Sequence, residues 1–258
     1  MKPASLGGSR AAAALSVTVV VALWVGLTWN GQVSDLFLPD PGELWSAFLD
    51  LVDEGYKSRP LLEHIGDSVT RVLVGFGIGA LIGTALGLAM GYLPVVDALC
   101  APFIEFLRPL PQLAYLVLLI IWFGIGETSK ITLLFLAALP VSAVAARDGV
   151  RNVAITRLQA VQSLGANRWQ MFRYVVFPSA LAEIFTGARL AIGAVYGTLI
   201  AAEIIAGTSG IGWLILDAGR FLRSDYVFVG IFIIGIMGIL LDRLLVTVEH
   251  RIVHWAGK

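Results

Sequence analysis

The residues of this sequence best suited to chemistry are ionisable side chains within or beside long apolar stretches: Arg71, Glu105, Arg108, Arg189 and Glu203. Charges at membrane depth are costly, so they are candidates for a functional role. Arg108, Gln112 and Tyr115 recur at the i, i+4, i+7 spacing of one helix face. Pro109 and Pro111 predict a kink beside them. We interpret this face as a set of polar groups lining a path for a small anion or zwitterion.

The other charged residues of this set have interpretations of their own. Glu203 precedes the glycine-rich segment 207–212 and is predicted either to join the path at an outer gate or to bond to another helix. Glu105 and Arg108 are three residues apart, so they are also predicted to pair with each other. Arg71 and Arg189 lie near the ends of apolar stretches and are predicted to extend toward the membrane surface.

Neither a catalytic site nor a metal site is predicted. His64, His250 and His254 have no ligand-like spacing to carboxylates or cysteines. The single cysteine, Cys100, lies in an apolar stretch, where a small buried side chain is its usual role. Segment 124–130 superficially resembles a phosphate loop, but no glycine precedes its lysine, so we interpret it as a tight turn. We expect a protein that is not an enzyme and binds no cofactor in this chain.

The composition indicates a membrane protein. Hydrophobic residues make up 58% of the 258 residues and charged residues 14%, whereas soluble domains carry about a quarter charged residues. About 20 apolar residues cross the hydrocarbon core as a helix. Six segments qualify: 11–29, 68–93, 98–123, 131–146, 184–206 and 226–248. We therefore expect an all-α fold with about six transmembrane helices, the first being a retained anchor. The net charge of zero argues against a nucleic-acid partner.

Charged residues near the ends of these segments predict the orientation. Loop 30–67 is mostly acidic, whereas loop 147–183 is rich in arginine. Basic loops stay in the cytoplasm, so loop 147–183 is predicted to be cytoplasmic and loop 30–67 external. Residues 1–10 and 251–258 are then cytoplasmic termini, and residues 68–250 form a core of five helices.

The external loop has a helix of its own in this prediction. Asp40 can cap a helix that Pro41 begins. Leu44, Phe48 and Leu51 recur at helical spacing, so we predict a short amphipathic helix.

Glycine recurs every four residues in the second apolar segment, at Gly75, Gly79, Gly83, Gly87 and Gly91. Small residues at this spacing let two membrane helices approach closely. Four residues turn a helix by about 400°, so the stripe drifts around the helix axis. We predict helix packing rather than a functional site.

The cytoplasmic loop contains a helix–turn–helix pattern. Its apolar residues recur every three positions: Ile155, Leu158, Val161 and Leu164. Gly165 predicts a left-handed helix stop, and Asn167 a cap for a second helix that Pro178 ends. Such an apolar stripe fits either the groove of a soluble partner or the inner leaflet of the membrane. Periodicity alone leaves both interpretations open.

A family resemblance favours the first interpretation, the groove of a soluble partner. Residues 159–165 (Gln-Ala-Val-Gln-Ser-Leu-Gly) and 175–178 (Val-Val-Phe-Pro) resemble the signature of binding-protein-dependent ABC importer permeases. That signature is Glu-Ala-Ala, three residues, Gly, nine residues, then Ile-x-Leu-Pro. Gly165 and Pro178 are in register, whereas Gln159 replaces the signature glutamate, which removes any ion pair that the glutamate would make with the ATPase.

The resemblance covers nearly the whole chain from Phe37 onward. Segments 108–115, 121–130 and 201–212 are similar to permeases of taurine, alkanesulfonate and nitrate importers, and most of all to taurine permeases. It implies a type I ABC importer permease fold in a bacterial inner membrane. The expected cargo is taurine or a related sulfonate, with nitrate or another small anion as the alternative. A secondary transporter is a weaker alternative, because the two halves show no matching repeat.

The same resemblance implies the partners: a second copy of the chain, two ATPase subunits that bind ATP and Mg, and an external substrate-binding protein. The cytoplasmic loop would be the coupling helix, seated in a groove of the ATPase. The residues implied at this contact are Leu158, Gln159, Ala160, Val161, Leu164, Gly165, Ala166, Arg168 and Pro178.

Overall fold

The computed structural model describes residues 6–29 and 33–253. Within these residues every regular element is a helix, and the single β-type pairing is an isolated bridge between Tyr56 and Arg59. The chain divides into two compact units, one of Met1–Leu62 with Leu214–Phe232 and one of Glu63–Trp213 with Ile233–Lys258. The chain is an all-α membrane protein, as its composition predicts.

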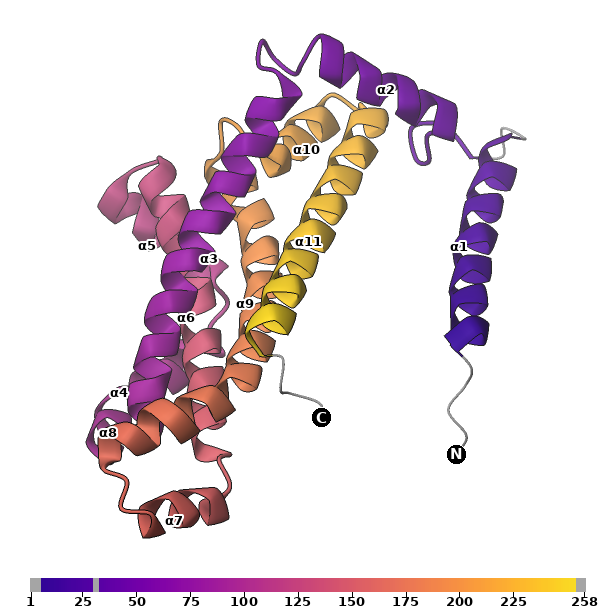
Figure 1. Cartoon of the computed structure of the whole chain (residues 1–258). Coiled ribbons are helices and arrows are strands. Elements are labelled where there is room, and N and C mark those ends of the chain that lie inside the picture. The colour runs from indigo at the N-terminus through magenta and orange to yellow at the C-terminus, as the bar shows by residue number, and fades with distance from the viewer. Residues whose placement is uncertain (1–5, 30–32, 254–258) are drawn as a thin grey trace. The chain divides into compact units, whose positions relative to one another are not determined.

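The helices follow one another along the chain (Figure 1) with these bounds: α1 Leu6–Trp29, α2 Pro41–Asp53, α3 Leu61–Tyr92, α4 Pro94–Leu107, α5 Leu113–Phe123, α6 Glu127–Arg151, α7 Ile155–Ser163, α8 Arg168–Met171, the π-helix η1 Phe172–Val176, α9 Phe177–Ala206, α10 Ile211–Arg220 and α11 Ser224–Ile252.

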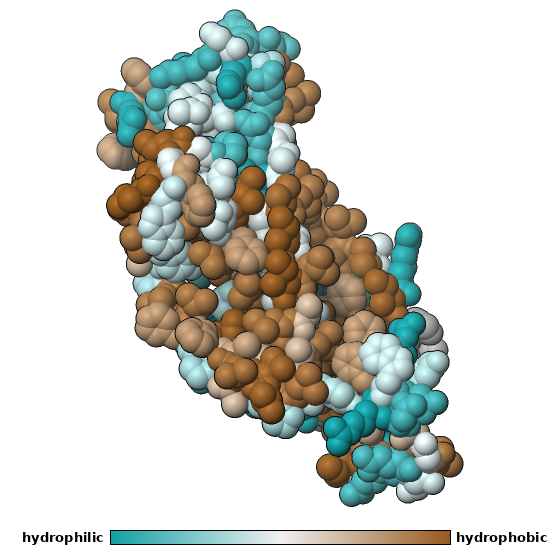
Figure 2. All heavy atoms as spheres, turned by 90° about the vertical axis from the view of Figure 1, so that its left-hand side faces the viewer, coloured by the Kyte–Doolittle hydropathy of each residue, from teal (hydrophilic) through white to brown (hydrophobic). Residues whose placement is uncertain are grey.

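Four stretches are long and apolar enough to cross a membrane: α3, α6, the continuous stretch Arg168–Ala206 and α11. They correspond to four of the six predicted segments. Two more apolar helices among the described residues, Ala14–Trp29 of α1 and α5, are shorter. Figure 2 shows hydrophobic side chains over the middle of the face on which α3 and α5 lie. Leu81, Val117 and Ile121 are among the exposed apolar residues of these helices, which suits a lipid environment.

The third predicted segment, 98–123, is two helices rather than one kinked helix. The chain leaves the helical path between α4 and α5, at residues 108–112. Proline has no N–H to donate and its ring meets the carbonyl four residues earlier. Two such residues, Pro109 and Pro111, therefore break the helix outright.

Pro178 does not end the helix that Asn167 begins, contrary to the prediction. Arg168–Ala206 is one continuous helical stretch, and Pro178 lies in the first turn of α9. The turn before it widens into the π-helix η1. This widening accommodates the missing N–H and the bulk of the proline ring without stopping the chain.

The glycine stripe of α3 packs against α6, as predicted. A Cβ atom at Gly79, Gly83 or Gly87 would collide with the backbone oxygen of Phe135, Leu139 or Ala143, respectively. Gly75 and Gly91 continue the same register against Ile131 and Arg147. The stripe therefore faces one helix along its whole length, because rows of residues spaced by four on α3 and on α6 run alongside each other where the helices cross.

Helix α9 completes this core. A Cβ at Gly187 would collide with Ala145, and one at Gly149 would come within 3.2 Å of Ala180. A fully buried cluster that includes Val72, Leu134 and Val195 joins α3, α6 and α9, which lie side by side (Figure 1). Small residues at both interfaces explain how three membrane helices approach this closely.

The other unit contains the predicted amphipathic helix, α2. The Asp40 carboxylate accepts hydrogen bonds from the backbone N–H groups of Gly42 at 2.5 Å and Glu43 at 3.0 Å, with Pro41 at the first helical position. The apolar side of α2 is partly buried: Leu44 and Leu51 are buried, whereas Phe48 is half-buried. In the same unit the carboxylate of Asp217 in α10 accepts from the Tyr56 hydroxyl at 2.8 Å and pairs with Lys57 at 2.7 Å.

Candidate functional site

The predicted coupling loop contains a hydrogen-bonded glycine turn between α7 and α8. Gly165 has φ +80°, its N–H donates to the Gln162 carbonyl at 2.9 Å, and the N–H of Ala166 donates to the Val161 carbonyl at 3.3 Å. This pair of bonds is the Schellman helix stop that glycine at this position favours. The glycine stop is therefore confirmed.

The helix after the turn begins with the predicted cap. The Asn167 side chain accepts from the Gln170 N–H at 2.9 Å, and the Gln170 side chain accepts from the Asn167 N–H at 2.9 Å. Such a reciprocal capping box satisfies donors that a helix start leaves unpaired.

The outer surface of α7 and of the turn after it is exposed and carries both polar and apolar side chains. None of the residues of α7 is buried, and Leu164 is 86% exposed. Of the nine predicted contact residues, four are half-buried: Leu158, Val161, Ala166 and Pro178. The other five are exposed: Gln159, Ala160, Leu164, Gly165 and Arg168. Four of the nine lie on α7, three on the turn after it and one at the start of α8, whereas Pro178 lies beyond η1 in α9.

Helix α7 contacts the core helices through Leu158. This side chain packs against a buried cluster of Val150 and Val153, at the end of α6, with Val176 and Ala180, around the start of α9. A displacement of α7 would therefore act directly on α6 and α9.

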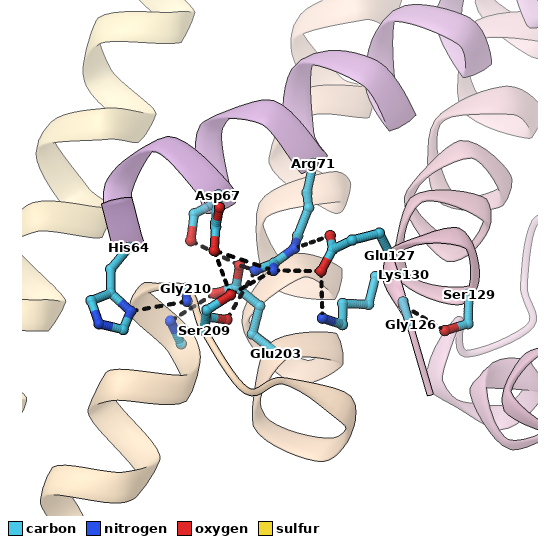
Figure 3. Close-up of polar contacts among 12 residues, drawn as sticks. His64, Asp67, Arg71, Gly126, Glu127, Ser129, Lys130, Glu203, Ser209 and Gly210 are labelled. Carbon is cyan, nitrogen blue, oxygen red and sulfur yellow. Dashed lines mark hydrogen bonds and ion pairs between the residues drawn. The ribbon is translucent and has the colours of Figure 1, made fainter. Parts of the chain in front are cut away.

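A second polar site lies at the other ends of these helices, where α3 and α6 begin and α9 ends (Figure 3). Arg71 lies at its centre with 2% of its side chain exposed. It binds the Glu127 carboxylate with Nε at 2.6 Å and Nη2 at 2.7 Å, and the Glu203 carboxylate with Nη1 at 2.6 Å. Arg71 does not extend to the membrane surface, contrary to the prediction.

The segment after α9 completes the coordination of Arg71. Nη1 donates to the Ser209 carbonyl and Nη2 to the Ser209 hydroxyl, both at 3.0 Å. All five N–H donors of the guanidinium are thereby used. Ser209 in turn donates to Asp67, four residues before Arg71.

Glu203 is fully buried and forms the bond between helices that was one of its two predicted roles. Its carboxylate accepts from Arg71, from the Ser68 hydroxyl at 2.8 Å and from the Gly212 N–H at 2.8 Å. His64 accepts from the Gly210 N–H at 3.2 Å. These bonds tie α3 to α9 and to the loop 207–210.

Sequence reasoning missed most of this site. Its signals were the i, i+4 spacing of Asp67 and Arg71 and the acid–base spacing of Glu127 and Lys130, which form an ion pair at 2.9 Å. The contribution of Ser209 depends on where the loop after α9 returns, which local spacing does not reveal.

The predicted pairing of Glu105 with Arg108 is wrong. Glu105 pairs with Arg147 of α6 at 3.1 Å rather than with Arg108. Arg147 also binds Asp97, which Arg151 contacts at 2.6 Å. Burial acts to raise the pKa of Asp97, but the two guanidinium groups outweigh it and hold the pKa below its usual range.

Arg189 is exposed and forms an ion pair with Asp242 of α11 at 2.9 Å, rather than only extending toward the surface. This pair joins the middle of α9 to α11.

The predicted face of Arg108, Gln112 and Tyr115 does not lie on one helix. Arg108 ends α4 and is exposed, Gln112 begins α5 and is half-buried, and the proline break separates them. Tyr115 packs against a buried cluster that contains Leu116 and Ala202, the residue before Glu203.

Among the described residues no group of three or more histidine, cysteine, aspartate or glutamate side chains is arranged to hold a metal ion. Cys100 is a free, half-buried thiol on α4. His254 lies outside the described residues.

Two candidate sites thus lie at opposite ends of the core helices: the charge cluster around Arg71, and the exposed helix α7 with the turn that follows it. The model of the family described as "binding-protein-dependent transport system inner membrane component" matches residues 78–254. The chain belongs to this family, and it is an inner-membrane permease of the ABC importer class.

Several curated relatives match most of the chain. The taurine transport system permease protein TauC of Escherichia coli is 40% identical over 94% of this chain and 89% of its own length. The putative aliphatic sulfonates transport permease protein SsuC of Bacillus subtilis is 32% identical over 93% and 86%. The nitrate import permease protein NrtB of Synechocystis is 30% identical over 93% and 88%.

Solved structures agree on the fold. Two crystal forms of the inward-facing MetNI methionine ABC transporter contain a chain of similar fold, with TM-scores of 0.58 and 0.62 at 18% identity. These matches cover 72% and 77% of this chain and 95% and 96% of those chains.

Proposed function

We propose that this permease carries taurine or a closely related sulfonate across the membrane. The observation that supports this cargo best is the 40% identity to the E. coli taurine permease over 94% of the chain. Nitrate or another small anion is the second candidate, since the nitrate permease of Synechocystis is also similar over nearly the whole chain. All of these cargoes carry an anionic group.

The proposed assembly contains two copies of this chain, two ATPase subunits and an external substrate-binding protein. The family description supports the binding protein, since it specifies binding-protein-dependent transport. In this proposal ATP and Mg bind to the ATPase subunits, which carry out hydrolysis, and this chain supplies only the path. Both termini and the loop 147–183 face the cytoplasm, because basic loops stay on that side.

The proposed coupling uses α7 as a helix seated in a groove of the ATPase. Exposed Leu164 and Ile155 offer apolar contacts, and the Schellman turn fixes their geometry. When ATP draws the ATPase subunits together, α7 moves with them, and Leu158 transmits the displacement to α6 and α9. Because these helices are closely packed, they move together as a rigid body. This movement opens the path alternately to the outside and to the cytoplasm. Gln159 makes this contact with a neutral amide instead of a carboxylate.

The residues of the path remain a prediction. We propose that Arg108, Gln112 and Tyr115 contribute polar groups to it, on either side of the proline break. The exposure of Arg108 at the end of α4 is compatible with this role. Glu203 would act at the gate through the ion pair that it forms with Arg71.

The test is uptake by the whole transporter. The complex of this chain with its ATPase is reconstituted in liposomes with its binding protein, and labelled taurine is added with ATP. We expect ATP-dependent accumulation of taurine that ethanesulfonate inhibits and nitrate does not. Accumulation of nitrate without taurine would favour the second candidate. Uptake driven by an ion gradient without ATP would contradict the proposal.

A further inference from the structure

In the site around Arg71, one carboxylate of the protein itself binds two buried cations. Glu127 accepts two hydrogen bonds from Arg71, at 2.6 and 2.7 Å, and one from the Lys130 ammonium at 2.9 Å. Arg71 and Lys130 are 2% and 3% exposed, whereas the Glu127 side chain is 56% exposed. The two cations are therefore buried, whereas Glu127, which contacts both of them in Figure 3, is partly exposed.

The two cations differ in how fully their donors are used. The five N–H donors of Arg71 all have acceptors, two of them on Glu127. Lys130 has three N–H donors, and in the described part of the chain it makes one hydrogen bond, to Glu127. A buried ammonium with donors to spare favours additional oxygen acceptors. A ligand with three oxygens would satisfy Lys130 better than one carboxylate does.

An opposite charge lies beside the cations. Asp67 is 3.8 Å from Arg71, with 38% of its side chain exposed. A zwitterion whose anionic group replaced the Glu127 carboxylate would find Asp67 and the displaced Glu127 for its ammonium group. The site thus offers both signs of charge, which a zwitterion needs.

On the basis of the proposed function, we propose that Arg71 and Lys130 form a subsite for the anionic group of the transported solute, and that Glu127 is the internal occupant that the solute displaces. Because one anionic group replaces another, the two cations remain neutralised when the solute binds. The Glu127 side chain is already 56% exposed, so its carboxylate is partly solvated even while it binds the two cations.

Competition by Glu127 weakens the apparent affinity of the subsite for the solute, because the solute binds only when the Glu127 carboxylate has left Arg71 and Lys130. A transport path needs this property, because a solute that binds too tightly within the membrane is not released. Glu127 is thus a positioning residue that moderates the affinity, whereas Arg71 and Lys130 contact the solute.

The test measures equilibrium binding of labelled taurine to the purified permease–ATPase complex without the binding protein. Glu127→Gln weakens the internal competitor, so taurine should bind about tenfold more tightly than to wild type. Adding Lys130→Gln to this variant removes a charged donor and should reverse the gain, by about tenfold. Glu105→Gln is the matched control: Glu105 is 63% exposed and pairs with Arg147 at 3.1 Å, away from this site, so binding should not change.

A purely structural role for Glu127 would lower stability without tightening any ligand. If the Glu127→Gln complex does not assemble, as judged by size-exclusion chromatography, Glu127→Asp is measured instead. The shorter Asp side chain should no longer accept both hydrogen bonds from Arg71, so taurine should again bind more tightly than to wild type. Unchanged or weaker binding by a folded variant would overturn the inference.

Ethanesulfonate and nitrate, used as competitor probes, separate the inference from the proposed cargo. If wild type imports taurine but Glu127→Gln binds all three probes as wild type does, the subsite is wrong and the cargo stands. If wild type does not import taurine but Glu127→Gln binds ethanesulfonate or nitrate more tightly, the subsite stands and taurine is the wrong cargo.

Discussion

Three arginines in the core helices show how differently one residue type can be paired within one fold. Arg71 is buried and uses all of its donors, Arg147 binds two acidic residues of α4, and Arg189 forms one exposed pair with Asp242. Burial raises the cost of leaving a charge unpaired, whereas an exposed ion pair contributes little. The loss of stability when an ion-pair partner is removed should therefore depend on how buried the arginine is, and not on the length of the ion pair.

Glu203→Gln should destabilise the protein much more than Arg189→Gln. Neutralising Glu203 leaves buried Arg71 with a weaker partner, which should cost about 3 kcal/mol. Loss of the exposed pair of Arg189 should cost less than about 1 kcal/mol. Unfolding of both variants in detergent, followed by tryptophan fluorescence, measures the difference. Equal stability of the two variants would show that the buried pair is not an important tie between α3 and α9.

Arg108→Gln tests the predicted path at a residue that no described ion pair holds in place. Because Glu105 pairs with Arg147, assembly with the ATPase should not depend on Arg108. We expect uptake of taurine to fall several-fold while the ATPase stays attached and its basal hydrolysis is intact. Unchanged uptake would remove Arg108 from the path. Loss of assembly would show a structural role instead.

At the scale of elements, close helix packing depends on where the glycines meet a neighbouring backbone. The stripe of α3 faces the carbonyl groups of α6 at every fourth residue, and small residues repeat this arrangement between α6 and α9. Dispersion forces fall steeply with separation, so removing the side chain is what allows the two backbones to attract each other.

Gly83→Leu should sharply reduce the yield of folded protein, because a Cβ at this position collides with the Leu139 carbonyl. Gly77→Leu is the matched control in the same helix, since a Cβ at Gly77 has nothing within 4 Å. The two variants are compared by the monodisperse fraction in size-exclusion chromatography. A Gly83→Leu protein as stable as wild type would contradict the packing of α3 on α6.

At the scale of the whole molecule, the core helices α3, α6 and α9 connect the two candidate sites. The turn after α7 lies at one end of α6 and α9, and the site around Arg71 lies at the other. A rigid core would carry a displacement of α7 to the charged site, where Glu127, Ser209 and Glu203 come from three different segments. Small relative movements of these segments would change the coordination of Arg71.

Gly165→Val should uncouple the ATPase from this permease. A valine at φ +80° is strained, although nothing lies within 4 Å of its Cβ, so the effect arises from the backbone alone. We expect the ATPase to dissociate during purification or to lose its stimulation by substrate and binding protein. Gly165→Asn, which tolerates the left-handed region, should retain most of the coupling. Normal transport by Gly165→Val would exclude this turn as the coupling element.

The sequence by itself determined the membrane environment, the helical class, the glycine packing and the helix–turn–helix of residues 155–171. Each of these depends on composition or on neighbours within a few residues, such as Gly165 after an apolar stripe. Tertiary structure decided the breaks and the partners. Two prolines broke one predicted helix, whereas Pro178 was accommodated by a π-helix, because neighbouring helices determine whether a freed carbonyl can be tolerated. The partners of Arg71 lie 56, 132 and 138 residues away in the chain. Only the fold brings Glu127, Glu203 and Ser209 around one guanidinium, because a charge in the membrane is paired by whichever helices pack beside it.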